Sequence, residues 1–229
     1  MQADSFSLDF RQLNLFESET SRASLELIPA VWSAADALTS PEASVRSSGL
    51  EQLGMLGAAR FSPLVVYMLA TRLNEPELEL RAQVVKYLAQ VLLPDALGEM
   101  APEHVRLTLS QSLEQMRTRQ VFALLEVAEH VPESQMAVVH LLGECTYAGN
   151  HLVEIFSNRG LPLWVRKMAI GMSGEVGFLS TLPALERWVG RLETRLNGQQ
   201  SMPFLPNAHG DEFELVPFLR QAIERLRAP

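Results

Sequence analysis

Apolar residues recur at helical spacing along almost the whole chain, and prolines divide this pattern into segments of similar length. In residues 76–93, Leu80, Val84, Leu88 and Leu92 are each four residues apart, which places them on one face of a helix. Proline is favoured in the first turn of a helix and disrupts its interior. The prolines therefore mark helix starts and breaks, and the chain is expected to form an all-α fold of about ten or eleven helices.

Reading between these marks predicts helices over 25–38, 43–57, 62–74, 77–93, 102–115, 117–130, 134–147, 150–158, 162–176, 181–196 and 214–227. Alternation typical of a strand occurs only at Phe6, Leu8 and Phe10. The 47% hydrophobic content is ample for a buried core. The single cysteine, Cys145, excludes a disulfide framework within the chain.

Part of the helical pattern repeats after 35 residues. Residues 38–46 (LTSPEASVR) align with residues 73–81 (LNEPELELR), a third copy begins at 165–170 (VRKMAI), and a weaker one covers 136–143 (MAVVHLLG). The positions aligned with the repeated arginine are 46, 81, 135 and 166, so the steps are 35, 54 and 31 residues. The long step leaves room for one extra helix, which we expect within 95–115.

The repeated unit is a helix ending in Leu, a turn with Pro, then Val-Arg and a later Leu-Gly. It resembles the HEAT-repeat family over about 25–196, and is most similar to the short bacterial type also seen in phycobilisome-lyase-like proteins. The resemblance implies a right-handed α-solenoid of stacked antiparallel helix pairs, in which neighbouring pairs bury a continuous core. The acid that usually ends the first helix of a pair is replaced by Ser40 in one copy and present as Glu75 in the next.

The segments outside the repeats complete the expected organisation. Residues 1–21 are predicted to be a flexible N-terminal segment, and 22–196 the helical repeat domain. Residues 197–212 contain two glycines and two prolines and are expected to form a long loop, which is either functional or disordered. Residues 213–229 are expected to form a C-terminal capping helix.

The charge of the chain is unevenly distributed. Residues 1–150 hold 19 Asp and Glu against 10 Lys and Arg, whereas 151–229 hold 8 against 9. Because no Lys/Arg cluster appears in the acidic part, nucleic acid is not expected as a partner. Apolar stretches are too short for a membrane helix and no signal peptide is apparent, so we expect a cytoplasmic protein without membrane contact.

Candidate catalytic or metal-ligating residues are few. His140 and Glu144 share a helix face, with Cys145 and His151 close by in the chain. A zinc site needs three or four converging ligands, and Cys145 points away from the face that carries His140 and Glu144. The alternative is a solvated His–Glu pair beside a buried thiol. No glycine-rich phosphate loop follows a strand. We therefore expect no enzyme activity, no metal and no cofactor.

The resemblance implies that the second helix of each pair lines a concave surface, and the positions outside its apolar set are the candidate partner-binding residues. They are Ser48, Gln52, Met55, Gln83, Tyr87, Gln90, His140, Glu144, Met168, Met172 and Glu175. The alternatives are an ordinary solvated face and, for the two methionines of 162–176, core filling.

The sequence leaves three functions open. The leading hypothesis is a non-catalytic scaffold that binds a protein or peptide, preferably a basic one, on its concave or acidic surface. The alternatives are a cofactor-handling lyase-like or metal-binding HEAT protein, and a solenoid that binds nucleic acid. A fold alone does not decide among them.

Overall fold

The computed structural model describes residues 29–200 and 210–228. These residues form α-helices joined by short turns and 3-10 segments, with no strand among them, so the predicted all-α fold is confirmed. The chain divides into two compact units, the first ending at Ala58 and the second beginning at Ala59. None of the helices described combines the length and the apolar character that a bilayer-spanning segment requires.

The first unit contains a helix described over 29–37 and helix α2 (Ala43–Met55). Leu50 of α2 is 2% exposed and belongs to the core of this unit. Gly49 lies where the two helices approach each other: a Cβ added to it would lie 2.8 Å from the Ala34 carbonyl oxygen. A larger residue at this position would force the two helices apart.

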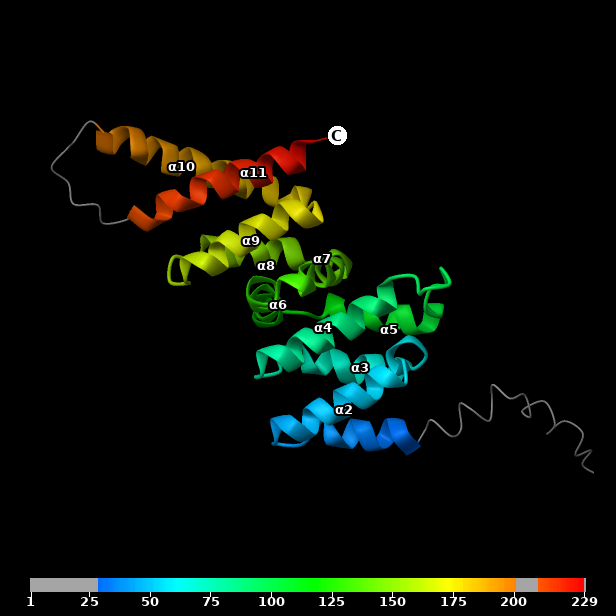
Figure 1. Cartoon of the computed structure of the whole chain (residues 1–229). Helices are drawn as coiled ribbons and strands as arrows, with labels where there is room; N and C mark the ends of the chain where they lie inside the picture. Colours follow the sequence, from blue (N-terminus) through cyan, green and yellow to red (C-terminus); the bar gives the residue numbers. More distant parts are fainter. Residues whose placement is uncertain (1–28, 201–209, 229) are drawn as a thin grey trace, which may run out of the picture. The chain divides into compact units, whose positions relative to one another are not determined.

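The second unit consists of nine described helices. They are α3 (Pro63–Thr71), α4 (Leu78–Leu92), α5 (Glu103–Glu114), α6 (Thr118–His130), α7 (Gln135–Glu144), α8 (Ala148–Ser157), α9 (Leu163–Val176), α10 (Leu182–Gln200) and α11 (Leu215–Arg227). Helix α4 packs on α7, α7 on α9, and α9 on α11, while α3 packs on α5 and α6 on α8. In Figure 1, α3 and α4 lie at one end of this unit, and α10 and α11 at the other.

The arginines that the repeat alignment brought together share an unusual environment. Arg46, Arg81 and Arg166 are 8%, 8% and 3% exposed, although arginine is rarely buried in proteins. Each lies four residues after an extended N-cap residue, and its backbone N–H donates to the carbonyl of that residue. The sequence repeat therefore corresponds to one structural position, the end of the first turn of α2, α4 and α9.

Two of these arginines donate side-chain hydrogen bonds to backbone carbonyls of the segment that precedes their helix. The Arg46 Nη1 donates to the carbonyl oxygens of Ser40 and Pro41, at 3.1 and 2.9 Å. The Arg166 Nε donates to the carbonyl oxygen of Phe156 near the end of α8, at 2.9 Å. Because the last carbonyls of a helix and the carbonyls of a turn lack helical partners, a buried guanidinium with several N–H donors suits this position.

Helix α5 contains a further arginine with the same kind of hydrogen bonds, which the repeat alignment did not identify. The Arg106 backbone N–H donates to the Pro102 carbonyl, as at the other repeat arginines, and its Nε donates to the Ala101 carbonyl at 3.0 Å. Val105 precedes it, so the Val-Arg pair was present in the sequence. The prediction of an extra helix within 95–115 is confirmed, because α5 occupies Glu103–Glu114.

The observed boundaries of the helices follow the expected end signals. Pro63 opens α3 after Ser62, whose Oγ accepts from the Val65 N–H, and Gly177 ends α9 with a φ of 84°, a left-handed conformation that favours glycine. Helix α10 continues to Gln200, beyond the expected end at residue 196. Of the predicted segments, 1–21 lies outside the described residues, and so does most of 197–212. The division into repeat domain, loop and cap stays a prediction.

Candidate functional site

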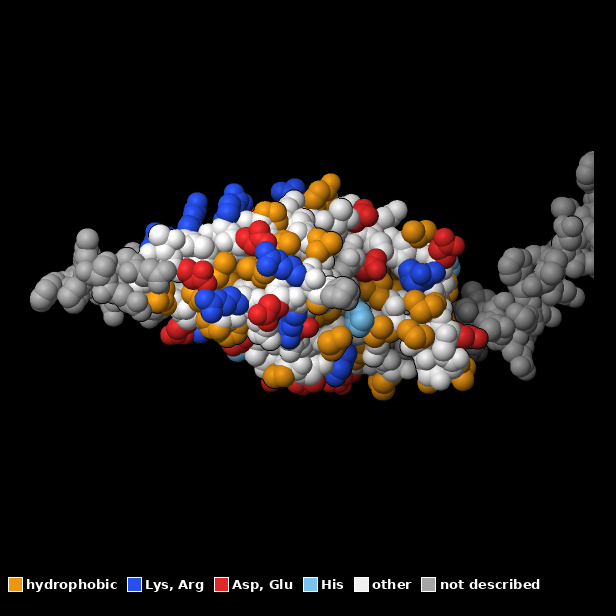
Figure 2. Space-filling view, turned by 90° about the horizontal axis from the view of Figure 1, so that it is seen from above, with side chains coloured by type: hydrophobic (Ala, Val, Ile, Leu, Met, Phe, Trp, Pro, Cys, Tyr) orange, Lys and Arg blue, Asp and Glu red, His pale blue; other side chains and the backbone are white. Residues whose placement is uncertain are grey.

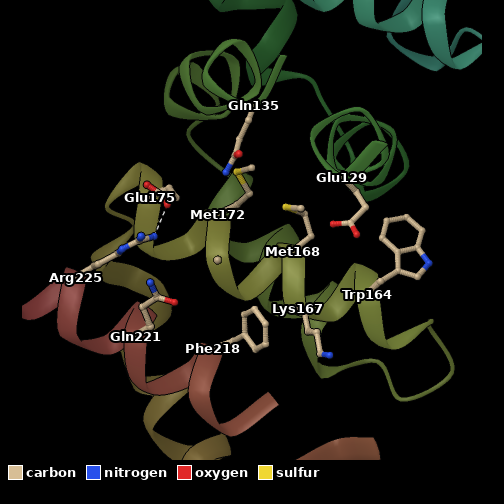
Figure 3. A pocket seen from close by; sticks show the side chains of 11 residues that line it. Glu129, Gln135, Trp164, Lys167, Met168, Met172, Glu175, Phe218, Gln221 and Arg225 are labelled. Carbon is tan, nitrogen blue, oxygen red and sulfur yellow. Dashed lines mark hydrogen bonds and ion pairs between the residues drawn. The ribbon is translucent and has the colours of Figure 1, made fainter. Parts of the chain in front are cut away.

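Three of the predicted partner-binding residues meet in one pocket of the second unit. This α9 pocket has a volume of about 450 Å3 and is formed by the side chains of α9 and α11 together with residues from α6 and α7 (Figure 3). It is lined by Glu129, Gln135, Trp164, Lys167, Met168, Gly171, Met172, Glu175, Phe218, Gln221 and Arg225.

The apolar part of the α9 pocket comes from two methionines and two aromatic rings. Met172 is 1% exposed and forms the deep part, whereas Met168 is half-buried and Phe218 is 38% exposed. Trp164 is held at one side, because the His130 ring lies edge-on to it with centroids 5.3 Å apart. Flexible thioethers beside aromatic rings adapt to side chains of different shape.

The charged groups of this pocket are paired, with one exception. Arg225 donates to the Glu175 carboxylate, and the Lys167 Nζ lies 2.6 Å from Glu214 Oε2. Glu129 is exposed, and its carboxylate has no hydrogen-bond or ion-pair partner among the described residues. Figure 3 shows this carboxylate next to Trp164 and Met168. The pocket therefore offers one uncompensated negative charge beside an aromatic ring.

A second pocket, the α4 pocket, lies on the other side of the same chain segment. It has a volume of about 350 Å3 and is lined by Glu79, Ala82, Gln83, Lys86, His130, Val131, Glu133 and Ser134. Glu129 and Gln135 line the α9 pocket, and four of the five residues between them, His130, Val131, Glu133 and Ser134, line the α4 pocket. The two pockets are thus neighbours separated by the end of α6 and the turn into α7.

The α4 pocket contains an acceptor without a donor. Gln83 Oε1 is buried and has no hydrogen-bond partner among the described residues. Glu79 and Glu133 are exposed and likewise have no partner for their carboxylates in the described part of the chain. Leaving a buried acceptor unpaired costs about 1–3 kcal/mol, so a donor supplied by a bound partner would be favourable here.

The structure distributes the other predicted residues over both units. Ser48 and Met55 are exposed and Gln52 is half-buried, all on α2 in the first unit. Tyr87 is half-buried and Gln90 exposed on α4, and neither lines the α9 pocket or the α4 pocket. The fold therefore brings together Met168, Met172 and Glu175 in one pocket and places Gln83 in its neighbour.

The residues considered for catalysis have different surroundings: His151 Nδ1 lies 2.9 Å from the Thr118 Oγ1, which donates to Glu154. Glu144 is exposed and accepts a hydrogen bond from the Ser110 Oγ at 2.8 Å, while His140 is half-buried. Cys145 is fully buried, as predicted for a structural thiol, and this burial raises its pKa. Among the described residues, no group of three or more His, Cys, Asp or Glu side chains could hold a metal ion.

Thiol labelling tests the burial of Cys145 directly, because Cys145 is the single cysteine of the chain. The thiolate is the reactive form, so a buried thiol with a raised pKa is expected to react with an aromatic disulfide reagent only when the protein opens. Native protein should be labelled at least about tenfold more slowly than urea-unfolded protein. Equal rates in the two states would contradict the buried position.

Sequence reasoning missed the side chains that complete the α9 pocket. Trp164 lies four residues before Met168, so helical spacing alone could have placed the two on one face. Glu129 and Phe218 come from helices distant in sequence, and no local pattern connects them to α9. Their contribution depends on how α6 and α11 pack on α9.

Comparison of the chain with protein-family models, with curated proteins and with solved structures gave no match.

Proposed function

We propose that this chain is a non-catalytic interaction module that binds a basic segment of another protein. In this proposal the second unit is a HEAT-like α-solenoid, and the groove is formed by the α9 pocket and the α4 pocket. Two observations support the solenoid: α4, α7, α9 and α11 pack on one another in chain order, and the buried arginines recur at one helical position. Stacked repeats use such surfaces for binding.

The unpaired carboxylate of Glu129 beside Trp164 carries this proposal. A guanidinium or ammonium group is attracted both by a carboxylate and by the face of an indole ring. Lys167 and Arg225, the bases of the same pocket, are already paired with Glu214 and Glu175. A cation from a partner is therefore the group that would complete this site.

The methionines next to Glu129 define the neighbouring part of the partner. The side chains of Met168 and Met172 are flexible, so they adjust to pack against an aliphatic or aromatic side chain of the partner. Burial of such a side chain contributes about 1.5–3 kcal/mol. The preferred segment thus carries a Leu, Met or Phe close to an Arg or Lys.

The α4 pocket extends the same preference along the segment. Glu79 and Glu133 add two carboxylates that lack partners among the described residues, and Lys86 is the only Lys or Arg in the lining. The unpaired Gln83 Oε1 accepts a hydrogen bond from a second basic side chain or from a backbone N–H of the partner. The net charge of −9 in residues 1–150 favours the approach of a basic partner.

Selection from a library of short displayed peptides tests the proposal. We expect enriched sequences to combine Arg or Lys with Leu, Met or Phe, and Glu129→Gln to weaken their binding about tenfold. The loss should shrink as salt is added, because a charge is removed from a partly exposed site. Binding is measured by fluorescence anisotropy over a series of salt concentrations.

Two further variants separate a binding role from a folding role. Phe218→Ala removes a ring that is 38% exposed; it should weaken binding, and thermal unfolding of the variant measures how much stability the lost packing costs. Glu103→Gln removes an exposed acid of α5 that lines neither pocket, and serves as the matched control for Glu129→Gln. Peptides that bind both pocket variants as tightly as the control variant would show that the α9 pocket is not the binding site.

A further inference from the structure

A third pocket lies between α8 and α10, on residues that the proposed peptide site does not use. This arginine pocket has a volume of about 460 Å3 and is lined by Val153, Ser157, Arg159, Ala184, Arg187, Trp188 and Arg191. The charged members of the lining are all arginines. In Figure 2, which looks onto the end of the unit that carries α10 and α11, Lys and Arg side chains project along one edge.

The packing of Trp188 shapes this pocket. Trp188 is 8% exposed, and its Nε1 donates to the Ser157 Oγ at 3.2 Å, which links α10 to the end of α8. The Arg159 guanidinium carbon lies 5.6 Å from the centroid of the indole ring. Arg187 and Arg191 are exposed and four residues apart on α10, so their side chains share one helix face. The apolar part of the lining comes from Val153 of α8 and from Ala184 and Trp188 of α10.

The charge around this pocket is not balanced. Glu212 is the one carboxylate among the described residues that pairs with the arginines of this region, and it lies within 3.5 Å of Arg159, Arg166 and Arg195. It therefore serves three guanidinium groups and forms no ion pair with Arg187 or Arg191. The pocket is lined by three arginines and by no carboxylate, so it is positive although the whole chain has a net charge of −8.

The acidic side chains of α10 do not compensate the two remaining arginines. Glu186 pairs with Arg227 at 2.7 Å, and Glu193 pairs with Arg220 at 2.6 Å. Arg187 donates its Nε to a backbone carbonyl of its own helix, and Arg191 has no partner for its side chain among the described residues. These exposed guanidinium groups are thus available to an anion from outside the chain.

We propose that the arginine pocket binds a small molecule that carries a phosphate monoester. The phosphate lies between Arg187, Arg191 and Arg159, because guanidinium groups donate pairs of N–H bonds to phosphate oxygens. The organic part lies against Val153 and Ala184. A pocket of this size matches those that hold small ligands, and its position on α8 and α10 leaves the α9 and α4 pockets free for a peptide.

Phenyl phosphate is the probe for this proposal, measured by titration calorimetry at low salt on the full chain. Benzoate, which has one negative charge, and neutral benzyl alcohol are the comparison ligands. We expect phenyl phosphate to bind at least about tenfold more tightly than benzoate, because a dianion gains more from several guanidinium groups. Its affinity should fall below a pH of about 6, where the second phosphate proton returns.

The double variant Arg187→Gln, Arg191→Gln tests the residues. Both side chains are exposed and neither pairs with Glu212, so the variant is expected to keep its thermal stability and to bind phenyl phosphate about tenfold more weakly. Arg119→Gln, an exposed arginine of α6 outside the pocket lining, is the matched control and should bind like the unaltered chain.

Three outcomes would overturn the proposal. Unchanged affinity in the double variant would show that Arg187 and Arg191 do not hold the phosphate. Benzoate binding as tightly as phenyl phosphate would show an unselective positive surface. Binding confined to a phosphoserine peptide, or to vesicles that contain phosphatidic acid, without binding of phenyl phosphate would assign the pocket to a macromolecule. None of these outcomes depends on the peptide site on α9.

Discussion

Replacing Glu212 by glutamine is expected to lower the free energy of unfolding by about 3 kcal/mol, because it removes the ion-pair partner of the buried Arg166 guanidinium. Arg166 is 3% exposed, and its Nη1 lies 3.3 Å from Glu212 Oε1. Burial already lowers the pKa of Arg166, and the Glu212 carboxylate opposes that effect. Arg166 Nη2 is buried without a partner among the described residues, so loss of the carboxylate would leave the charge poorly compensated.

Glu214→Gln is the control for this substitution. Glu214 lies two residues further along, is exposed, and pairs with Lys167 at 2.6 Å. Exposed ion pairs contribute about 0–1 kcal/mol, so this variant should differ little from the unaltered chain. Urea unfolding followed by helical circular dichroism measures both. Equal stability of the Glu212 and Glu214 variants would contradict the central role assigned to Glu212.

Two glycines of α9 are expected to respond in opposite directions to alanine. A Cβ at Gly174 would lie 3.0 Å from the Ala222 Cα and 3.4 Å from its carbonyl oxygen on α11. Because the contact is with backbone, α9 and α11 would have to move apart, and overpacking of this kind costs about 1–3 kcal/mol. At Gly171, nothing among the described residues lies within 4 Å of the added Cβ, so alanine should stabilise the helix by about 1 kcal/mol.

The two substitutions replace the same residue type in the same helix. The difference between their effects on stability therefore reports the packing of α9 on α11. It is measured as the shift in the midpoint of thermal or urea unfolding. Gly190→Ala on α10 offers a second open position, since no described atom lies within 4 Å of its added Cβ. A Gly174→Ala variant as stable as Gly171→Ala would mean that α11 does not approach α9 this closely.

The helices could be predicted closely because their ends are encoded locally. Pro63 after Ser62 starts α3, and Gly177 ends α9 in a left-handed conformation. The sequence predicts the end of α10 too early, because Asn197-Gly198 is a turn signal, and the helix continues through these residues to Gln200. The Arg106 copy of the repeat was missed because the alignment followed a spacing near 35 residues, and α5 interrupts that spacing.

The candidate site was predicted only in part, for a related reason. Met168 and Met172 were placed on one face by their spacing in α9. The core interpretation agrees with the burial of Met172, which is 1% exposed and lines the pocket, while the binding role of both methionines stays a prediction. Glu129 and Phe218 join the pocket through contacts between helices, which periodicity within one helix does not contain.

The sequence by itself determined the all-α fold, the order of the helices, the uneven charge and the repeated arginine. These properties depend on residues within a few positions of one another, where spacing, end signals and composition act directly. Only the tertiary structure decided what the arginines and carboxylates contact. Glu212 gathers three guanidinium groups from the α8–α9 turn, α9 and α10, while Glu129, Arg187 and Arg191 have no ion-pair partner among the described residues. Ion pairing depends on distances of a few ångströms between segments that are far apart in the chain, and packing alone sets those distances.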